Sequence, residues 1–94
     1  MSTKQELIDE ICGHLGIPTH FVSTGSTEPK EFLEAVIDQM GLTGLSAGLG
    51  KQALGKLIVE ADGRSWLPEF DSTGATITKE GLMAIRDSVF HLTR

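Results

Sequence analysis

The chain has 94 residues, 39% of them hydrophobic, which suits one small folded domain and is too short for a two-domain enzyme. Eight basic and thirteen acidic residues give a formal charge of −5, which excludes a uniformly basic surface that binds nucleic acid nonspecifically. A single cysteine, Cys12, excludes an internal disulfide framework and a multi-cysteine zinc site. The polar amino terminus and the lack of a long apolar run predict a soluble, cytoplasmic protein.

An internal repeat organises the chain. Residues 23–38 align without a gap with residues 72–87, and nine of these sixteen positions are identical. Upstream, the run Lys-Gln-x-Leu occurs at residues 4–7 and again at 51–54. Each repeat is too small to bury its own apolar face and must pack against the other. We therefore predict one domain over residues 1–94, made of two repeats (3–42 and 50–92) joined by a glycine-rich connection (41–50).

The first repeat contains two stretches with apolar residues at three- and four-residue spacing, over 7–15 and 32–40. This spacing predicts two amphipathic helices. Gly16 and Gly41 are plausible helix ends, and Pro29 suits the first turn of the second helix. Between the helices lies a loop with Pro18 and a hydroxyl-rich segment.

The connection 41–50 carries four glycines and no charge, and its Leu42, Leu45 and Leu49 are expected to pack at least in part on the core. The second repeat begins after this connection and repeats the helical pattern over 54–61 and 82–92. Gly63 is the expected end of the first of these helices, and Thr78 the expected N-cap of the second.

The loop of the second repeat contains Pro68 and then a β-branched run with alternating Thr73, Ala75 and Ile77. This run favours a short strand, which would pair with its equivalent from the first repeat across the pseudo-dyad. The predicted fold is thus mainly α, with four helices in two tandem helix–loop–helix repeats, pseudo-two-fold symmetry and a short two-stranded ribbon.

The two repeats differ in charge. Residues 1–47 carry two basic and seven acidic residues, a net charge of −5, whereas residues 48–94 carry six of each. Either only the second repeat meets an anionic partner, or the acidic first repeat repels unwanted polyanions.

Both hydroxyl-rich segments, Ser-Thr-Gly-x-Thr, run into a predicted helix start, where free backbone N–H groups and the helix dipole favour phosphate. Alternatively, the hydroxyls only satisfy backbone groups of the loop and the helix start.

Trp66 has two interpretations as well. Its ring, close to Arg64, would stack on a base, or it anchors the core, as a lone tryptophan in a small domain more often does.

Several resemblances to catalytic motifs are rejected. The run Gly50–Leu57 has the glycine and lysine spacing of a P-loop but ends in leucine where Mg²⁺ needs a hydroxyl. Glu28-Pro29-Lys30 resembles half of a nuclease metal site but opens a helix. The three histidines lie far apart without metal-ligand spacing. We expect no catalytic residue, no metal and no cofactor, and therefore no enzyme.

The repeated pattern Lys-x-x-Leu, Ser-Thr-Gly-Ser/Ala-Thr and Lys-Glu-x-Leu-x-Ala-Val/Ile resembles small helical modules attached to bacterial restriction endonucleases and HNH nucleases. The resemblance covers nearly the whole chain and is most marked over 50–92. It implies DNA binding within a bacterial restriction-modification or defence system, with cutting done by a nuclease domain of the same or another chain.

These observations give two hypotheses. In the first, the chain is a DNA-binding accessory module that contacts phosphates through the second hydroxyl-rich loop, the following helix start and nearby cations. The rival is a protein-interaction or assembly module whose acidic first repeat docks on a basic partner or on the second repeat of another copy, so a homodimer is left open. The candidate nucleic-acid-binding residues are Lys51, Lys56, Arg64, Trp66, Ser72, Thr73, Gly74, Thr76, Thr78 and Lys79.

Overall fold

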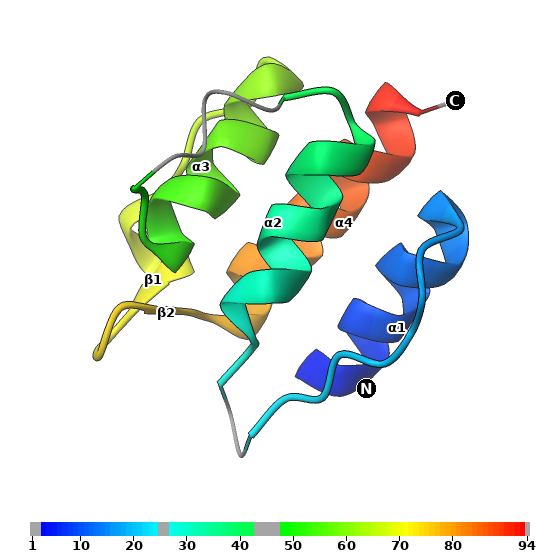
Figure 1. The fold of residues 1–94 in the computed structure, drawn as a ribbon. Coiled ribbons are helices and arrows are strands. Elements are labelled where there is room, and N and C mark those ends of the chain that lie inside the picture. Colours follow the sequence, from blue (N-terminus) through cyan, green and yellow to red (C-terminus); the bar gives the residue numbers. More distant parts are fainter. Residues whose placement is uncertain (1–2, 25–26, 43–47, 94) are drawn as a thin grey trace.

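A computed structural model of the chain describes residues 3–24, 27–42 and 48–93. The four predicted helices are confirmed in position and order (Figure 1). The elements are α1 (Lys4–Leu15), α2 (Lys30–Gln39), α3 (Lys51–Ala61), the short 3₁₀ helix η1 (Pro68–Phe70), β1 (Asp71–Ser72), β2 (Thr76–Ile77) and α4 (Lys79–Leu92). Within the described ranges, no helix has the length and apolar character needed to cross a membrane.

Side-chain caps begin two of the helices. Thr3 and Glu6 form a reciprocal capping box at the start of α1. Thr78 caps α4 as predicted, since its hydroxyl accepts the Gly81 N–H at 3.2 Å. Pro29 was predicted to lie in the first turn of α2. It is instead the residue just before the helix.

Glycines mark the ends of the first three helices. In each case a glycine with positive φ lies at the helix end or one residue after the cap, where an L side chain would be strained. The φ values are 73° at Gly16, 76° at Gly41 and 80° at Gly63. These predicted ends are confirmed.

The core lies between the four helices, with α2 and α4 in the middle and α1 and α3 on either side (Figure 1). α4 packs on both α1 and α3, so the two repeats share one core rather than stacking as separate units. Two residues of the predicted helical faces, Ala61 and Leu92, are exposed instead. The buried hydrophobic residues are Leu7, Ile8, Ile11, Cys12, Phe32, Leu33, Val36, Ile37, Leu54, Ile58, Val59, Ile77, Leu82, Ile85 and Val89.

The connection between the repeats packs on the core in the parts that the structure describes. Leu42 and Leu49 are partly buried against the core cluster, as expected. Leu45, the third leucine expected to pack there, lies outside the described residues.

The predicted ribbon exists, but its predicted pairing across the pseudo-dyad is wrong. β2 pairs antiparallel with β1 of its own loop, in a register that sets Asp71 opposite Ile77 and Ser72 opposite Thr76. The first repeat forms its own local bridge between Thr24 and Thr27. Each loop therefore folds back on itself, because a hairpin partner close in sequence costs little loop-closure entropy.

The predicted strand is also shorter than expected. Thr73, Gly74 and Ala75 form the loop between the paired residues Ser72 and Thr76, and Gly74 and Ala75 have φ values of 77° and 61°, in the left-handed region. Ala75 thus belongs to the turn, and only Thr76 and Ile77 of the β-branched run form a strand.

Candidate nucleic-acid interface

The side chain of Gln52 links the start of α3 to the hairpin of the second repeat. Its amide nitrogen donates to the carbonyl oxygens of Ser72, at 3.0 Å, and Thr76, at 2.8 Å. The first turn of α3 therefore lies beside the β1–β2 hairpin (Figure 1). This contact brings Lys51, Ser72, Thr73, Gly74 and Thr76, five of the predicted site residues, to one end of the molecule.

Gln5 makes the corresponding contact in the first repeat. It accepts the Ser23 N–H at 2.7 Å and the Ser23 hydroxyl at 3.2 Å, and it donates to the Phe21 carbonyl at 2.9 Å. The role of Gln5 and Gln52 was not predicted. Their repetition 47 residues apart was the signal that could have indicated it.

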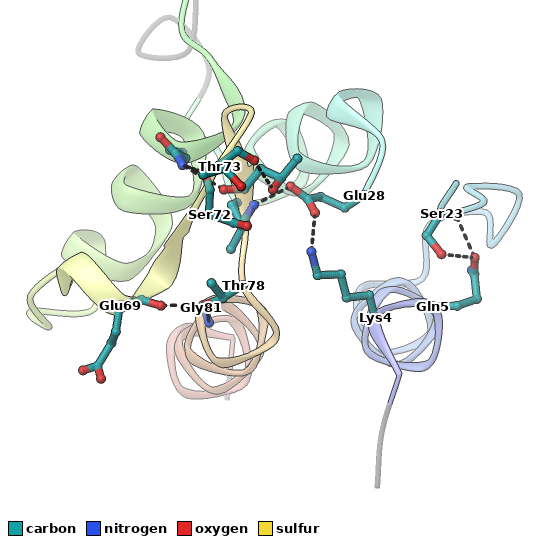
Figure 2. A network of polar contacts seen from close by, with 12 residues as sticks. Lys4, Gln5, Ser23, Glu28, Glu69, Ser72, Thr73, Thr78 and Gly81 are labelled. Atoms are coloured by element: carbon teal, nitrogen blue, oxygen red, sulfur yellow. Dashed lines mark hydrogen bonds and ion pairs between the residues drawn. The ribbon is translucent and has the colours of Figure 1, made fainter. Parts of the chain in front are cut away.

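Two of the candidate hydroxyls already hold the loop together. The Thr76 hydroxyl donates to the Thr73 carbonyl at 3.2 Å. The Thr78 hydroxyl donates to the Glu69 carbonyl at 2.9 Å while accepting the Gly81 N–H (Figure 2). These two threonines satisfy backbone groups, as the alternative interpretation of the segment expects.

Three polar groups at this end have no partner among the described residues. Within the described ranges, the Lys51 ammonium and the hydroxyls of Ser72 and Thr73 make no hydrogen bond or ion pair. Ser72 and Lys51 are half-buried and Thr73 is exposed. Lys56, exposed one turn further along α3, has no such partner in the same part of the chain. These groups are the donors that an external anion would meet.

Lys79 lies at the base of the hairpin, near an acidic residue of the first repeat. The pKa of Glu6 lies below its ordinary value mainly because its carboxylate accepts the Thr3 backbone and side-chain hydrogen bonds. The Lys79 ammonium contributes a smaller lowering of that pKa. Lys79 therefore already attracts a carboxylate of the protein itself, that of Glu6.

Arg64 lies away from this group. At a helical rise of about 1.5 Å per residue, the far end of α3 lies about 15 Å from Lys51, and Arg64 follows that end. Its Nε donates to Asp62 Oδ2 at 2.8 Å, and the second oxygen of Asp62 bonds His91 Nδ1. Arg64 is thus not part of the cluster at the hairpin.

Trp66 packs on the core rather than standing free. Its ring meets Phe70 edge-on with centroids 5.1 Å apart, and its Nε1 donates to Asp71 Oδ1 at 2.7 Å. A Cβ built on Gly55 would lie 2.9 Å from the indole Cη2, so the glycine leaves room for the ring. The position agrees with the core-anchor interpretation.

Glu28 belongs to the run that resembles half of a nuclease metal site. Its burial was not predicted from the sequence. It is 0% exposed, and its two oxygens bond Lys4 Nζ and the Ile77 N–H (Figure 2). Among the described residues, no group of three or more histidine, cysteine or acidic side chains is placed to hold a metal ion. The buried Cys12 is a poor nucleophile, because burial raises the pKa of its thiol to about 11.

Comparison with protein-family models, curated proteins and solved structures found no match to this chain.

Proposed function

We propose that the chain is a DNA-binding module whose second repeat contacts backbone phosphates through Lys51, Ser72 and Thr73. One observation carries the proposal: a lysine and a serine that have partners within the first repeat have equivalents in the second repeat whose side chains have none among the described residues.

In the first repeat, the lysine and the serine of the pattern are both engaged. Lys4 Nζ lies 3.3 Å from Glu28 Oε2, and the Ser23 hydroxyl donates to Gln5. A cation and a hydroxyl bound in this way offer little to an external anion.

In the second repeat, Lys51 and Ser72 occupy the equivalent positions, but the equivalent of Glu28 is the apolar Ile77. At that position the second repeat therefore offers Lys51 no carboxylate like the one that Lys4 contacts. Gln52 bonds the backbone carbonyl of Ser72 and leaves its hydroxyl unbonded within the described ranges. A lysine ammonium and two hydroxyls at the same end of the molecule are suitable donors for phosphate oxygens of one DNA backbone.

The charge distribution also favours a phosphate site on the second repeat. The whole excess of acidic residues lies in the first repeat, so the second repeat is the side that a polyanion approaches at lower electrostatic cost. Contacts of this kind fix the position of DNA without reading its sequence.

Salt-dependent binding tests the proposal. Titration of a duplex oligonucleotide into labelled protein, repeated over a range of salt concentrations, gives the affinity and its dependence on salt. We expect Lys51→Gln to weaken binding and to lower the slope of log K against log salt by about 0.9, the value for one phosphate contact.

Lys30→Gln is the matched control. It makes the same charge change at the first residue of α2, in the first repeat, and should leave the slope unchanged. Equal effects of the two variants would mean that only net charge matters, and the proposed site would be wrong.

The resemblance to nuclease-attached modules supports a place beside a nuclease domain, in the same or another chain of a bacterial restriction or defence system. These residues then bind the duplex while the other domain cuts it. Incubation of the chain with duplex and Mg²⁺ should leave the DNA intact, and cleavage that copurifies with the wild-type protein would contradict this division of roles.

An acidic face on α2 favours a second candidate function, docking on a basic protein segment. Glu31, Glu34 and Asp38 are exposed, recur at helical spacing, and make no ion pair within the described ranges. A lysine-rich peptide should then shift the amide signals of α2, and replacing all three by their amides should abolish the shifts. Shifts confined to the second repeat would exclude this function.

A further inference from the structure

The carboxylate of Glu28 belongs to the first repeat but bonds the hairpin of the second. Its Oε1 accepts the Ile77 N–H at 3.0 Å, although the two residues are 49 positions apart in sequence. Its Oε2 lies 3.3 Å from Lys4 Nζ, whose side chain is 14% exposed. A fully buried carboxylate is costly unless it is paired and hydrogen-bonded, and Glu28 is both.

Ile77 is the point where the hairpin joins the rest of the molecule. The next N–H, that of Thr78, points toward β1 and bonds the Phe70 carbonyl at 2.9 Å. Successive N–H groups of a strand point to opposite sides, so the Ile77 N–H lies on the outer edge of β2, where Glu28 meets it. The Ile77 side chain is buried in the core.

Side chains from both repeats therefore bond the backbone of this hairpin. Gln52 of the second repeat bonds the carbonyls of Ser72 and Thr76, and Glu28 of the first repeat bonds the N–H of Ile77. Gln52 ties the hairpin to α3, and the buried Ile77 side chain packs it on the core. Glu28 adds a hydrogen bond to the hairpin from the first repeat.

We propose that Glu28 is a positioning residue for the phosphate site: by holding Ile77, it sets the hairpin hydroxyls in the place where they and Lys51 contact the same backbone. The first repeat then contributes to DNA binding without touching DNA. This inference rests on the proposed function of the second repeat.

Two double variants isolate the hydrogen bond from the buried charge. Both carry Lys4→Met, so neither leaves an unpaired ammonium. Lys4→Met/Glu28→Gln keeps a side-chain oxygen that accepts the Ile77 N–H, whereas Lys4→Met/Glu28→Met fills a similar volume without an acceptor. The two proteins have the same net charge and differ in the acceptor for the Ile77 N–H and in the amide NH2 group of glutamine.

We expect the variant with glutamine to bind duplex DNA with nearly the wild-type affinity and salt slope. The variant with methionine should remain folded by circular dichroism, bind roughly three- to tenfold more weakly, as for the loss of one hydrogen bond, and show a lower salt slope. A residue with a purely structural role would change the melting temperature but not the salt slope of the folded protein.

Hydrogen exchange of the wild-type protein gives a second test that needs no variant. DNA bound at the hairpin should slow exchange of the Ile77 amide, because the hairpin and its bond to Glu28 are then stabilised together. An unchanged Ile77 rate in the complex would overturn the inference.

The outcomes distinguish a failure of DNA binding by the second repeat from a failure of the positioning role of Glu28. If the wild-type protein shows no salt-dependent DNA binding, the proposed function fails and the role of Glu28 fails with it. If the wild-type protein binds but the two double variants share one affinity and one slope, only the positioning role is wrong.

Discussion

Gly81 and Gly13 are both helical glycines, but the space around them differs. A Cβ on Gly81 would lie 2.5 Å from Ile77 Cγ2 and 3.0 Å from the Phe70 carbonyl oxygen, whereas a Cβ on Gly13 would meet nothing within 4 Å. We expect Gly81→Ala to lower the free energy of unfolding by about 1–3 kcal/mol, since overpacking outweighs helix propensity. Gly13→Ala should raise it by up to about 1 kcal/mol.

Urea denaturation of both variants measures these changes. A stabilising Gly81→Ala would show that the hairpin is packed less tightly on α4 than the structure indicates.

Ala75 is the one residue other than glycine with a positive φ, 61°, in the described part of the chain. This conformation brings the Cβ of an L residue close to the carbonyl oxygen and costs about 1–2 kcal/mol, which glycine does not incur. Part of this gain is offset by the greater flexibility of unfolded glycine. Ala75→Gly should therefore raise the midpoint of urea unfolding, and a lower midpoint would contradict the turn geometry.

At the scale of single residues, the sequence predicted what depends on near neighbours. The cap at Thr78 and the helix ends at Gly16, Gly41 and Gly63 follow from the residues beside them. The bond between Glu28 and Ile77 joins residues 49 apart and depends on how the two repeats pack. No local pattern contains that information.

Asp62 and His91 connect the carboxyl end of α3 to the last turn of α4. The His91 hydrogen bond, and to a smaller degree the Arg64 side chain, holds the pKa of Asp62 below its ordinary value of 3.8. A lowered folded pKa stabilises the protein above the unfolded pKa, and this stabilisation is lost as pH falls through the folded pKa.

Asp62→Asn should therefore destabilise the protein well above pH 3.8 and have a progressively smaller effect below it. Urea denaturation of wild-type and variant protein across this range measures the difference. Asp38→Asn, at an exposed position of α2, is the control and should show no such dependence. A difference that stays constant into strong acid would contradict the assigned contact.

The elements themselves were predicted better than their pairing. Apolar periodicity located all four helices, because each buries one face on a shared core. The β-branched run indicated a strand but not its partner. A tight loop containing Gly74 and Ala75 pairs β2 with β1 instead, and at its other edge the Ile77 N–H bonds the Glu28 side chain.

For the whole molecule, the sharing of one core makes each repeat dependent on the other. α4 packs on α1 as well as on α3, so a separated half loses buried partners on most of its apolar face. We expect fragments 1–47 and 48–94 to be unfolded alone by far-ultraviolet circular dichroism. Cooperative thermal unfolding of either isolated fragment would contradict this dependence.

The candidate site was predicted in part. The repeat and the charge asymmetry led to the second hydroxyl-rich segment, and the structure brings Lys51, Ser72 and Thr73 to one end. The sequence could not predict which hydroxyls form hydrogen bonds within the protein. The partners of Thr76 and Thr78 are backbone carbonyls whose positions depend on the hairpin and η1. The distance of Arg64 from the other candidate residues could not be predicted either, because it depends on the path of the loop after α3.

Amide chemical-shift mapping during a duplex titration tests the central claim most directly, because it locates binding as well as detecting it. At low salt we expect shifts at Lys51 and over 72–74 that diminish as salt rises, and no comparable shifts at the equivalent Lys4 and Ser23. Shifts centred on Lys4 and Ser23, or none at saturating duplex, would contradict a phosphate site on the second repeat.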